Sequence, residues 1–333
     1  MKKSAATFYT AQIVAGVLAS AVAYALLPRQ LKRGQVVVIT GGSRGLGFAL
    51  AERFARAGSK IVLCARNDEE LEQARQSLLQ KGAVQHEDDI LLVSADLSDE
   101  SQASGLIDST IHAFGLIDIL VNNAGIMEVG PAENQPIDAY ERAMATNFFA
   151  ALYTTYAAMP SMLEQRSGKI VNIASIGGKF AVPHMLPYVA SKFALVGFSE
   201  GLHAELRHKG IRVTTVCPGL MRTGGEANAH FRGQVDQEKA WFNLAAKTPI
   251  VAASVTHAAN RIINAVAAGR AEITITPQAW LAARIAGIAP ETTQWVASLT
   301  NQYILPEPSD LDPRPDISRP FWATDLQSTA DEV

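Results

Sequence analysis

Short apolar runs alternate with longer periodic segments over most of this chain. The short runs are rich in β-branched residues and almost continuously apolar, as strands buried on both faces of a sheet are. The longer segments repeat apolar residues at three- and four-residue spacing, as helices packed on a sheet do. This alternation predicts a doubly wound α/β domain, with one seven-stranded parallel sheet and helices on both faces. The predicted strands are Val36–Ile39, Ile61–Cys64, Ile90–Val93, Ile119–Asn122, Lys169–Ile173, Arg212–Cys217 and Glu272–Thr276.

The chain continues well past the last predicted strand. Gln278–Leu305 is apolar and is interrupted by Pro290, so we expect two short helices that lengthen the core. The residues after Leu305 are polar and rich in proline, a composition that favours an extended tail without chemistry of its own.

Composition excludes several classes of partner. The formal net charge is −3 and no run of Lys or Arg occurs, so we expect no nucleic-acid ligand. The two cysteines, Cys64 and Cys217, are far apart in apolar runs, which argues against a disulfide framework and favours a reducing compartment. The seven histidines form no pair with ligand spacing, and we therefore predict no required metal.

A glycine-rich turn follows the first predicted strand directly and leads into a helical pattern. Glycines at 41, 45 and 47 allow a tight turn and a close backbone approach, so that backbone amides and a helix N-terminus can meet a pyrophosphate. The spacing is GxxxGxG, which differs from the GxGxxG of the ordinary dinucleotide fingerprint. A plain strand-to-helix loop remains the alternative.

The residues after the second strand indicate which dinucleotide would bind. An acidic residue usually holds the ribose hydroxyls of NAD at this point, but the chain has Ala65-Arg66 there. Arg66 and Arg44 could instead clamp a ribose 2′-phosphate, since guanidinium groups pair well with phosphate oxygens. We therefore predict NADP(H) as the cofactor, with two solvated loop arginines as the alternative.

Tyr188 and Lys192 stand at the start of a helical segment. Their i, i+4 spacing puts both side chains on one helix face, where they can share a ligand. A neighbouring ammonium favours the phenolate and would lower the tyrosine pKa from about 10, which makes the pair a usable proton relay. Taken alone, this spacing is equally compatible with an ordinary surface helix.

Over roughly residues 35–276 the chain resembles the short-chain dehydrogenase/reductase family. The motifs that carry the resemblance occur in the family's order, which chance does not readily produce. They are Thr40-Gly41-x-x-x-Gly45-x-Gly47, Asp96-Leu97, Asn122-Asn123-Ala124-Gly125, Asn147, Ser175, Tyr188-x-x-x-Lys192 and Pro218-Gly219.

The resemblance implies a Rossmann-type fold and an oxidoreductase that interconverts a carbonyl compound and an alcohol. It implies that Tyr188 exchanges the proton, that Ser175 orients the reacting oxygen, and that Lys192 holds the nicotinamide ribose and lowers the tyrosine pKa. It also implies that Asn147 positions a water that links the lysine to solvent. The cofactor contacts it implies, together with those argued above, are Thr40, Gly41, Ser43, Arg44, Gly45, Leu46, Gly47, Arg66, Asp96, Leu97, Asn123, Ala124, Gly125, Tyr188, Lys192, Pro218, Gly219 and Thr223.

Two apolar stretches could form the walls of a substrate pocket. Residues 223–250, which cover the substrate in this family, carry Phe231, Trp241, Phe242 and Leu244, and the stretch before Tyr188 carries Phe180, Val182, Met185 and Leu186. These side chains predict a small-molecule carbonyl or alcohol substrate of lipophilic, lipid-like character. Packing of the lid against itself is the alternative.

The uncharged segment Phe8–Leu27 precedes the predicted sheet and matches the roughly 20 residues that span a bilayer. We favour a membrane anchor over a surface-lying helix, and we discount a cleaved secretory signal because a secreted enzyme would lose its dissociable cofactor. The same reason places the catalytic domain on the cytoplasmic side, with a soluble cytoplasmic protein as the alternative.

We accordingly divide the chain into a hydrophobic helix (1–33), a catalytic domain (34–277), a helical extension (278–305) and a polar tail (306–333). The resemblance also implies a homodimer or homotetramer. The functional alternatives are a non-catalytic NADP(H)-binding sensor, a nucleotide-sugar epimerase or dehydratase on the same frame, and a membrane scaffold.

Overall fold

The computed structural model describes residues 31–222, 224, 229–247 and 252–309. The predicted membrane anchor, the cofactor contact predicted at Thr223 and the tail beyond residue 309 lie outside the described residues. Among the helices within those ranges, none has both the length and the apolar content that crossing a membrane requires.

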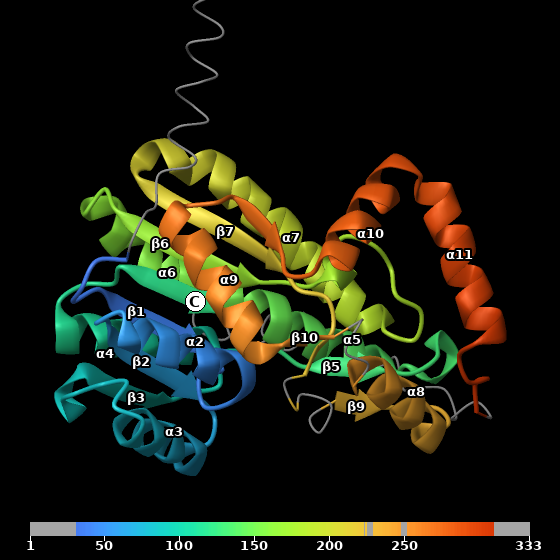
Figure 1. Ribbon diagram of the computed structural model, residues 1–333, viewed down its shortest axis with the longest axis horizontal. Coiled ribbons are helices and arrows are strands. Elements are labelled where there is room, and N and C mark those ends of the chain that lie inside the picture. Colours follow the sequence, from blue (N-terminus) through green and yellow to red (C-terminus); the bar gives the residue numbers. More distant parts are fainter. Residues whose placement is uncertain (1–30, 223, 225–228, 248–251, 310–333) are drawn as a thin grey trace, which may run out of the picture.

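A seven-stranded sheet forms the centre of the protein, with all neighbouring strands parallel in the order β11-β7-β6-β4-β1-β2-β3 (Figure 1). Each of its strands coincides with one predicted from the sequence, which confirms the Rossmann-type α/β fold. The strands are β1 (Val36–Thr40), β2 (Lys60–Ala65), β3 (Ile90–Ser94), β4 (Ile119–Asn122), β6 (Gly168–Ile173), β7 (Ile211–Cys217) and β11 (Glu272–Thr274).

The last strand is shorter than predicted. β11 ends at Thr274 rather than Thr276, because the Thr276 hydroxyl accepts a hydrogen bond from the Ala279 N–H and thereby caps the next helix.

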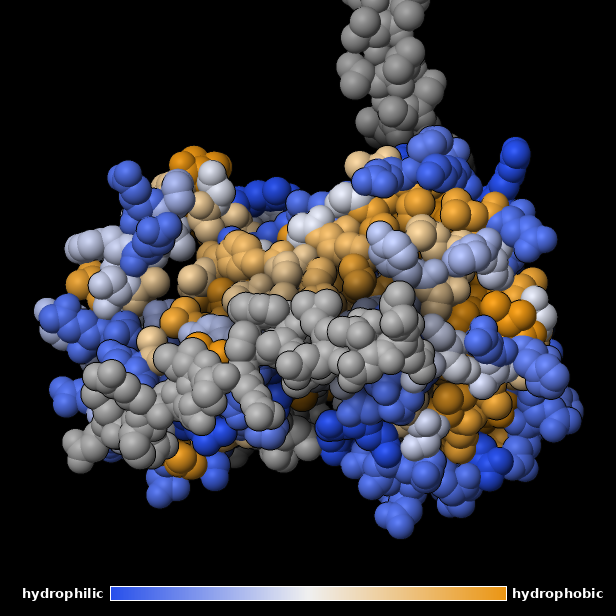
Figure 2. All heavy atoms as spheres, turned by 180° about the vertical axis from the view of Figure 1, so that it is seen from behind, coloured by the Kyte–Doolittle hydropathy of each residue, from blue (hydrophilic) through white to orange (hydrophobic). Residues whose placement is uncertain are grey.

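Helices cover both faces of the sheet, and buried apolar side chains form a core on each side. On one face lie α2 (Gly45–Arg56), α3 (Asp68–Gln80) and α9 (Val255–Ala268). On the other face lie α4 (Glu100–Phe114), α6 (Ala150–Glu164) and α7 (Leu186–Leu206). Figure 2 shows this second face, where apolar side chains gather in a band. Its helices leave Tyr156 of α6 and Phe193 of α7 substantially exposed.

Smaller elements lie beyond the carboxyl ends of the strands. Strand β5 (Met127–Val129) pairs in parallel with β9 (Ala229–Phe231), and helix α8 (Val235–Lys247) follows β9. We call β9 and α8 together the lid. Two further short strands, β8 (Met221–Arg222) and β10 (Ala253–Ser254), pair with each other, and α5 (Ile137–Met144) packs on α7.

Two helices follow the sheet, as predicted. They are α10 (Pro277–Ile288) and α11 (Pro290–Tyr303), and Pro290 occupies the first turn of the second helix, where its missing N–H costs nothing. The prediction that they lengthen the core is wrong. Ala279 is the one buried residue of the pair, and most of their large apolar side chains are exposed, including Ile288 at 84%. The apolar residues therefore face away from the body of the protein.

Candidate active site

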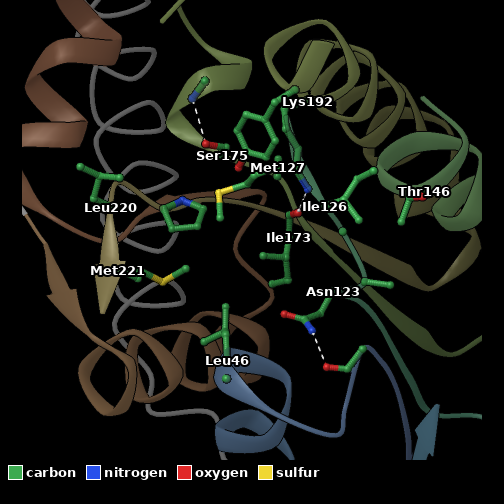
Figure 3. A pocket seen from close by; sticks show the side chains of 18 of the residues that line it. Leu46, Asn123, Ile126, Met127, Thr146, Ile173, Ser175, Lys192, Leu220 and Met221 are labelled. Atoms are coloured by element: carbon green, nitrogen blue, oxygen red, sulfur yellow. Dashed lines mark hydrogen bonds between the residues drawn. The ribbon is translucent and has the colours of Figure 1, made fainter. Parts of the chain in front are cut away.

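A large pocket lies at the carboxyl ends of the parallel strands, where open α/β sheets bind ligands. Its volume is about 930 Å³, and its wall combines the glycine-rich turn, the ends of several strands, the start of α7 and part of the lid. In Figure 3, Ser175 and Lys192 lie on one side of the pocket, and Leu46 and Asn123 lie toward the other end.

The glycine-rich turn has a conformation that only glycines accept easily. Gly41 and Gly45 have φ values of +60° and +57°, and a Cβ at Gly47 would lie 2.1 Å from the Gly41 carbonyl oxygen. Helix α2 begins at Gly45, and the residue before it, Arg44, makes no capping hydrogen bond through its side chain. The first amides of α2 are therefore available at the pocket wall, and the turn fits a pyrophosphate group.

Thr40 and Asn123 join the turn to the neighbouring strand. The Thr40 hydroxyl accepts hydrogen bonds from the backbone N–H groups of Asn123 and Ala124, at 2.9 and 3.0 Å. The Asn123 side-chain amide donates to the carbonyls of Thr40 and Gly41. These bonds fix the spacing between the ends of β1 and β4, which is the floor on which a dinucleotide would lie.

The end of the pocket that would receive the adenosine contains both predicted arginines and a carboxylate that the sequence interpretation missed. Arg44 pairs with Glu70 at 3.0 Å, and the Ser43 hydroxyl donates to the other oxygen of the same carboxylate. Glu70, Arg44 and Arg66 all line the pocket. Glu70 lies in the first turn of α3, where an acidic residue is ordinary, so nothing in the sequence distinguished it from Asp68 or Glu69.

The proposed catalytic side chains come from two neighbouring elements. Ser175 follows β6, and its hydroxyl accepts a hydrogen bond from the Gly177 N–H. The Ser175 and Tyr188 side chains are also joined by a hydrogen bond. Tyr188 and Lys192 lie one turn apart on α7, and the Lys192 ammonium is 5.7 Å from the centre of the Tyr188 ring. Lys192 donates to the Ile173 carbonyl at 2.9 Å (Figure 3). All three residues line the pocket.

Burial shifts the pKa values of both titratable groups in this arrangement. It raises the pKa of Tyr188 above its usual value of 10, against the opposing effect of the hydrogen bond to Ser175. Burial also lowers the pKa of Lys192 to about 8. The expectation of a lowered tyrosine pKa is therefore wrong for this state of the protein, because the cost of burying a phenolate outweighs the stabilisation it receives.

Asn147 lies behind the pocket wall in a one-turn π-helix, η3 (Ala145–Phe149), a distortion often found at functional sites. Its side chain accepts a hydrogen bond from the Ile126 N–H and donates to the Ile126 carbonyl and to Ser191. Ser191 in turn donates to the Tyr188 carbonyl at 2.7 Å. The sequence interpretation missed Ser191, whose position directly before Lys192 was the one available signal.

The structure brings most of the predicted cofactor contacts to this pocket. Thr40 and Gly47 do not line it, and neither does Asn147, which was predicted as a catalytic residue; all three support the wall from behind. The predicted contacts that do line it are Gly41, Ser43, Arg44, Gly45, Leu46, Arg66, Asp96, Leu97, Asn123, Ala124, Gly125, Tyr188, Lys192, Pro218 and Gly219.

The other end of the pocket is apolar. Phe180, Val182, Met185, Trp241 and Phe242 line it, as the sequence predicted. Three other predicted wall residues do not line it: Leu244 is 72% exposed, Leu186 lines a separate, smaller pocket, and Phe231 packs edge to face against Phe242 within the lid. Aromatic and aliphatic content alone does not reveal which way such side chains face.

Comparisons with known proteins agree with this geometry. The family model for short chain dehydrogenases matches residues 35–231. The chain is 38% identical to "Dehydrogenase/reductase SDR family protein 7-like" of Anopheles gambiae, over 80% of this chain and 79% of that protein. It is also 38% identical to "Dehydrogenase/reductase SDR family member 7B" of Bos taurus, over 60% of this chain and 62% of that protein.

Solved structures show the same fold. A short-chain dehydrogenase/reductase from Burkholderia phymatum in complex with NAD aligns with a TM-score of 0.71 and 26% identity, over 84% of this chain and 99% of that one. An actinorhodin polyketide ketoreductase with NADPH aligns with a TM-score of 0.63 and 29% identity, over 73% and 95% of the two chains. The two structures carry different nicotinamide cofactors.

Proposed function

This chain belongs to the short-chain dehydrogenase/reductase family and is an oxidoreductase acting on CH–OH or carbonyl groups, and from that premise we propose that it uses NADP(H) and acts on a lipophilic ketone or alcohol. The observation that carries the proposal is the convergence of Ser175, Tyr188 and Lys192 on the wall of the pocket that also contains the glycine-rich turn.

The bound nicotinamide would supply or accept the hydride. Tyr188 would donate a proton to the carbonyl oxygen during reduction, or accept it during oxidation, and Ser175 would hold that oxygen by a hydrogen bond. Lys192 would bind the nicotinamide ribose and stabilise a phenolate at Tyr188. The Asn147 side chain would position the start of α7 through Ser191, which bonds to the Tyr188 carbonyl. The Asn147 side chain and the Lys192 ammonium both lie beside Gly125, where the proposed water would link them.

Arg44 and Arg66 support the preference for NADP(H), because their guanidinium groups lie at the pocket end that suits the adenosine, and Ala65 replaces the usual carboxylate of β2. Asp96 would contact the adenine amino group. The apolar wall at the opposite end, which includes Phe180, Met185 and Trp241, supports a neutral lipophilic substrate.

The test is a Tyr188→Phe variant, with the exposed tyrosine change Tyr156→Phe as the matched control. We expect Tyr188→Phe to bind NADPH normally, measured by fluorescence titration, and to lose at least about 100-fold in the rate of NADPH oxidation with a ketone substrate. The control should keep the wild-type rate. Equal rates in all three proteins would refute the assignment of Tyr188, whereas a wild type that binds NADPH but turns over no ketone would favour a sensor.

Substrate class requires a separate assay. A panel of steroid, retinoid, long-chain acyl and small polar ketones should show turnover chiefly with the lipophilic members. Turnover confined to the polar compounds would overturn this part of the proposal while leaving the role of Tyr188 intact.

We also propose membrane association, carried by the apolar sequence of Phe8–Leu27, and a homodimer or homotetramer that buries the apolar band of Figure 2. Exposure of Tyr156 and Phe193 on that face supports the second proposal. Carbonate extraction of a membrane fraction tests the first, since release into the soluble phase would exclude an anchor. Light scattering after chromatography tests the second, and a monomeric mass would exclude it.

A further inference from the structure

A buried carboxylate in the lid links two side chains that the proposed reaction does not use. Glu238 of α8 has no exposed surface, and one of its oxygens accepts a hydrogen bond from the His184 Nδ1–H at 2.7 Å. Its other oxygen accepts a hydrogen bond from the Trp241 indole N–H at 2.6 Å. Both oxygens of Glu238 are therefore occupied by donors, which is what a buried carboxylate needs to be stable.

The three residues join the lid to the segment that carries the tyrosine. His184 lies in the loop just before α7, and Tyr188 stands one helical turn further on. Glu238 and Trp241 lie one turn apart on α8, with the His184 and Trp241 rings edge to face at 6.5 Å. Because His184 and Glu238 are 54 residues apart in sequence, their contact holds the lid against the active-site loop.

His184 is itself held firmly in place. Its φ of +62° lies in the left-handed region, which residues other than glycine seldom adopt although histidine does so more often than most, and surrounding contacts hold it there. The contacts here are the bond to Glu238 and a 2.7 Å bond from the Gly130 N–H to the His184 carbonyl. Gly130 follows β5, the strand that pairs with the lid strand β9.

The lid also reaches the tyrosine by packing. Phe242, which follows Trp241 on α8, forms a buried apolar cluster with Met185 and Val189, and Trp241 and Tyr188 pack against this cluster. Trp241 and Tyr188 both line the pocket. Glu238 thus holds the polar edge of the indole, while the same side chain packs against the apolar cluster and lines the pocket.

We propose that Glu238 is a positioning residue for substrate selectivity: by bonding to His184 and Trp241 at once, it fixes the indole as a rigid wall for large apolar substrates. This inference rests on the proposed oxidoreductase function. A large ketone that fills the apolar end of the cavity, beyond the part assigned to the dinucleotide, must contact the indole, whereas a small ketone held at Ser175 and Tyr188 fills only a small part of that end. Rigidity of the wall therefore matters for the first and little for the second.

The decisive variant is Glu238→Gln, compared with Asp236→Asn as a matched control. The amide keeps the size of Glu238 but offers one acceptor in place of two, so one of the donors of His184 and Trp241 loses its partner. Asp236 is an exposed acid on the same helix, and its change to an amide leaves intact the clasp, by which we mean the two bonds from Glu238 to His184 and Trp241. A second variant, Trp241→Phe, keeps the bond between His184 and Glu238 and removes the indole N–H.

Steady-state kinetics with a bicyclic aromatic ketone and with butanone give the readout. We expect Glu238→Gln to raise the KM of the large ketone roughly tenfold, because the indole is no longer held in one orientation, while the KM of butanone changes less than about threefold. Trp241→Phe should act in the same direction. The double variant should show little further rise, because both changes act on the position of the same pocket wall.

The outcomes separate this inference from the proposed function. Wild-type protein that reduces neither ketone refutes the proposed function and this inference with it. If wild type turns over both ketones and Glu238→Gln has the same KM values as Asp236→Asn, only the role of Glu238 is refuted. An equal rise in KM for both ketones in Glu238→Gln refutes it as well. If Glu238→Gln lowers the melting temperature but changes the KM of both ketones to the same extent, the clasp stabilises the fold and does not set selectivity. If Glu238→Gln does not fold, an unchanged large-ketone KM in Trp241→Phe overturns the proposal, and a raised one supports it.

Discussion

Glu70 provides the sharpest test of cofactor choice. It accepts from the Ser43 hydroxyl and pairs with Arg44 at 3.0 Å, so it holds the arginine that we expect to bind a 2′-phosphate. Glu70→Gln removes a negative charge beside that site and frees the guanidinium. We therefore expect the variant to bind NADPH more tightly than wild type and to bind NADH about equally well.

The size of the effect follows from exposure and charge. The Arg44 and Glu70 side chains are 58% and 35% exposed, so their ion pair contributes at most about 1 kcal/mol, and losing it has little effect on folding. In water, two unit charges about 4 Å apart interact by about 1 kcal/mol, and a phosphate monoester carries about −1.5 to −2 charges. Relief of repulsion is then worth about 1 to 2 kcal/mol, which is a fall in the KM for NADPH of roughly 5- to 30-fold.

The assay measures the KM of NADPH and NADH at a fixed ketone concentration, for wild type, Glu70→Gln and Glu69→Gln. Glu69 is the exposed neighbour in the same first turn of α3 and controls for the change in net charge. The fall should shrink at high salt, since it is electrostatic. A large rise in the KM for NADH would mean that Glu70 holds the ribose hydroxyls, and it would refute the NADP(H) proposal; an equal change for both cofactors would refute the role of Arg44.

Three further changes have expected outcomes. Arg66→Ala should raise the KM for NADPH about tenfold and leave that for NADH nearly unchanged, because only the 2′-phosphate distinguishes the two. Gly47→Ala should abolish NADPH binding in a fluorescence titration, since its Cβ would lie 2.1 Å from the Gly41 carbonyl oxygen, whereas Gly105→Ala, with nothing within 4 Å, should bind normally. Burial lowers the pKa of Lys192 to about 8, against about 10.5 in the unfolded chain. Between pH 8 and 10.5 the unfolded chain therefore binds more protons than the folded protein. The free energy of unfolding should thus rise with pH from about 8 to 10.5, by up to about 3 kcal/mol, relative to Lys192→Met in urea titrations; the absence of this difference would contradict the buried charge.

The sheet was predictable because its strands are buried on both faces. A run such as Val36–Ile39 is continuously apolar, and in the structure every residue of β1 is buried. The two C-terminal helices show the limit of the same argument. Apolar content predicted α10 and α11, but it does not say whether an apolar face meets the body of the protein, and here Trp280 and Ile288 are exposed.

The candidate site likewise contains residues that the sequence predicted and residues that it did not. Residues such as Tyr188 and Lys192 were found because they are close in sequence and belong to known motifs. Glu70 and Glu238 were missed because their partners are distant in sequence: Arg44 is 26 residues from Glu70, and His184 is 54 from Glu238. A carboxylate in the first turn of a helix usually serves that helix, and only the fold shows what else it contacts.

The pKa directions also bear on how the proposed proton transfer would run. Since burial raises the pKa of Tyr188, its hydroxyl is protonated at neutral pH and can donate to a carbonyl oxygen without prior activation. The difficult species is then the phenolate left behind, which the hydrogen bond from Ser175 and the Lys192 charge would stabilise. Lys192, with a pKa of about 8, holds its charge at neutral pH yet lies near enough to that pH to pass a proton on. The arrangement would therefore favour reduction at or below neutral pH, whereas above pH 8 the loss of the Lys192 charge would remove the support for the phenolate that oxidation needs.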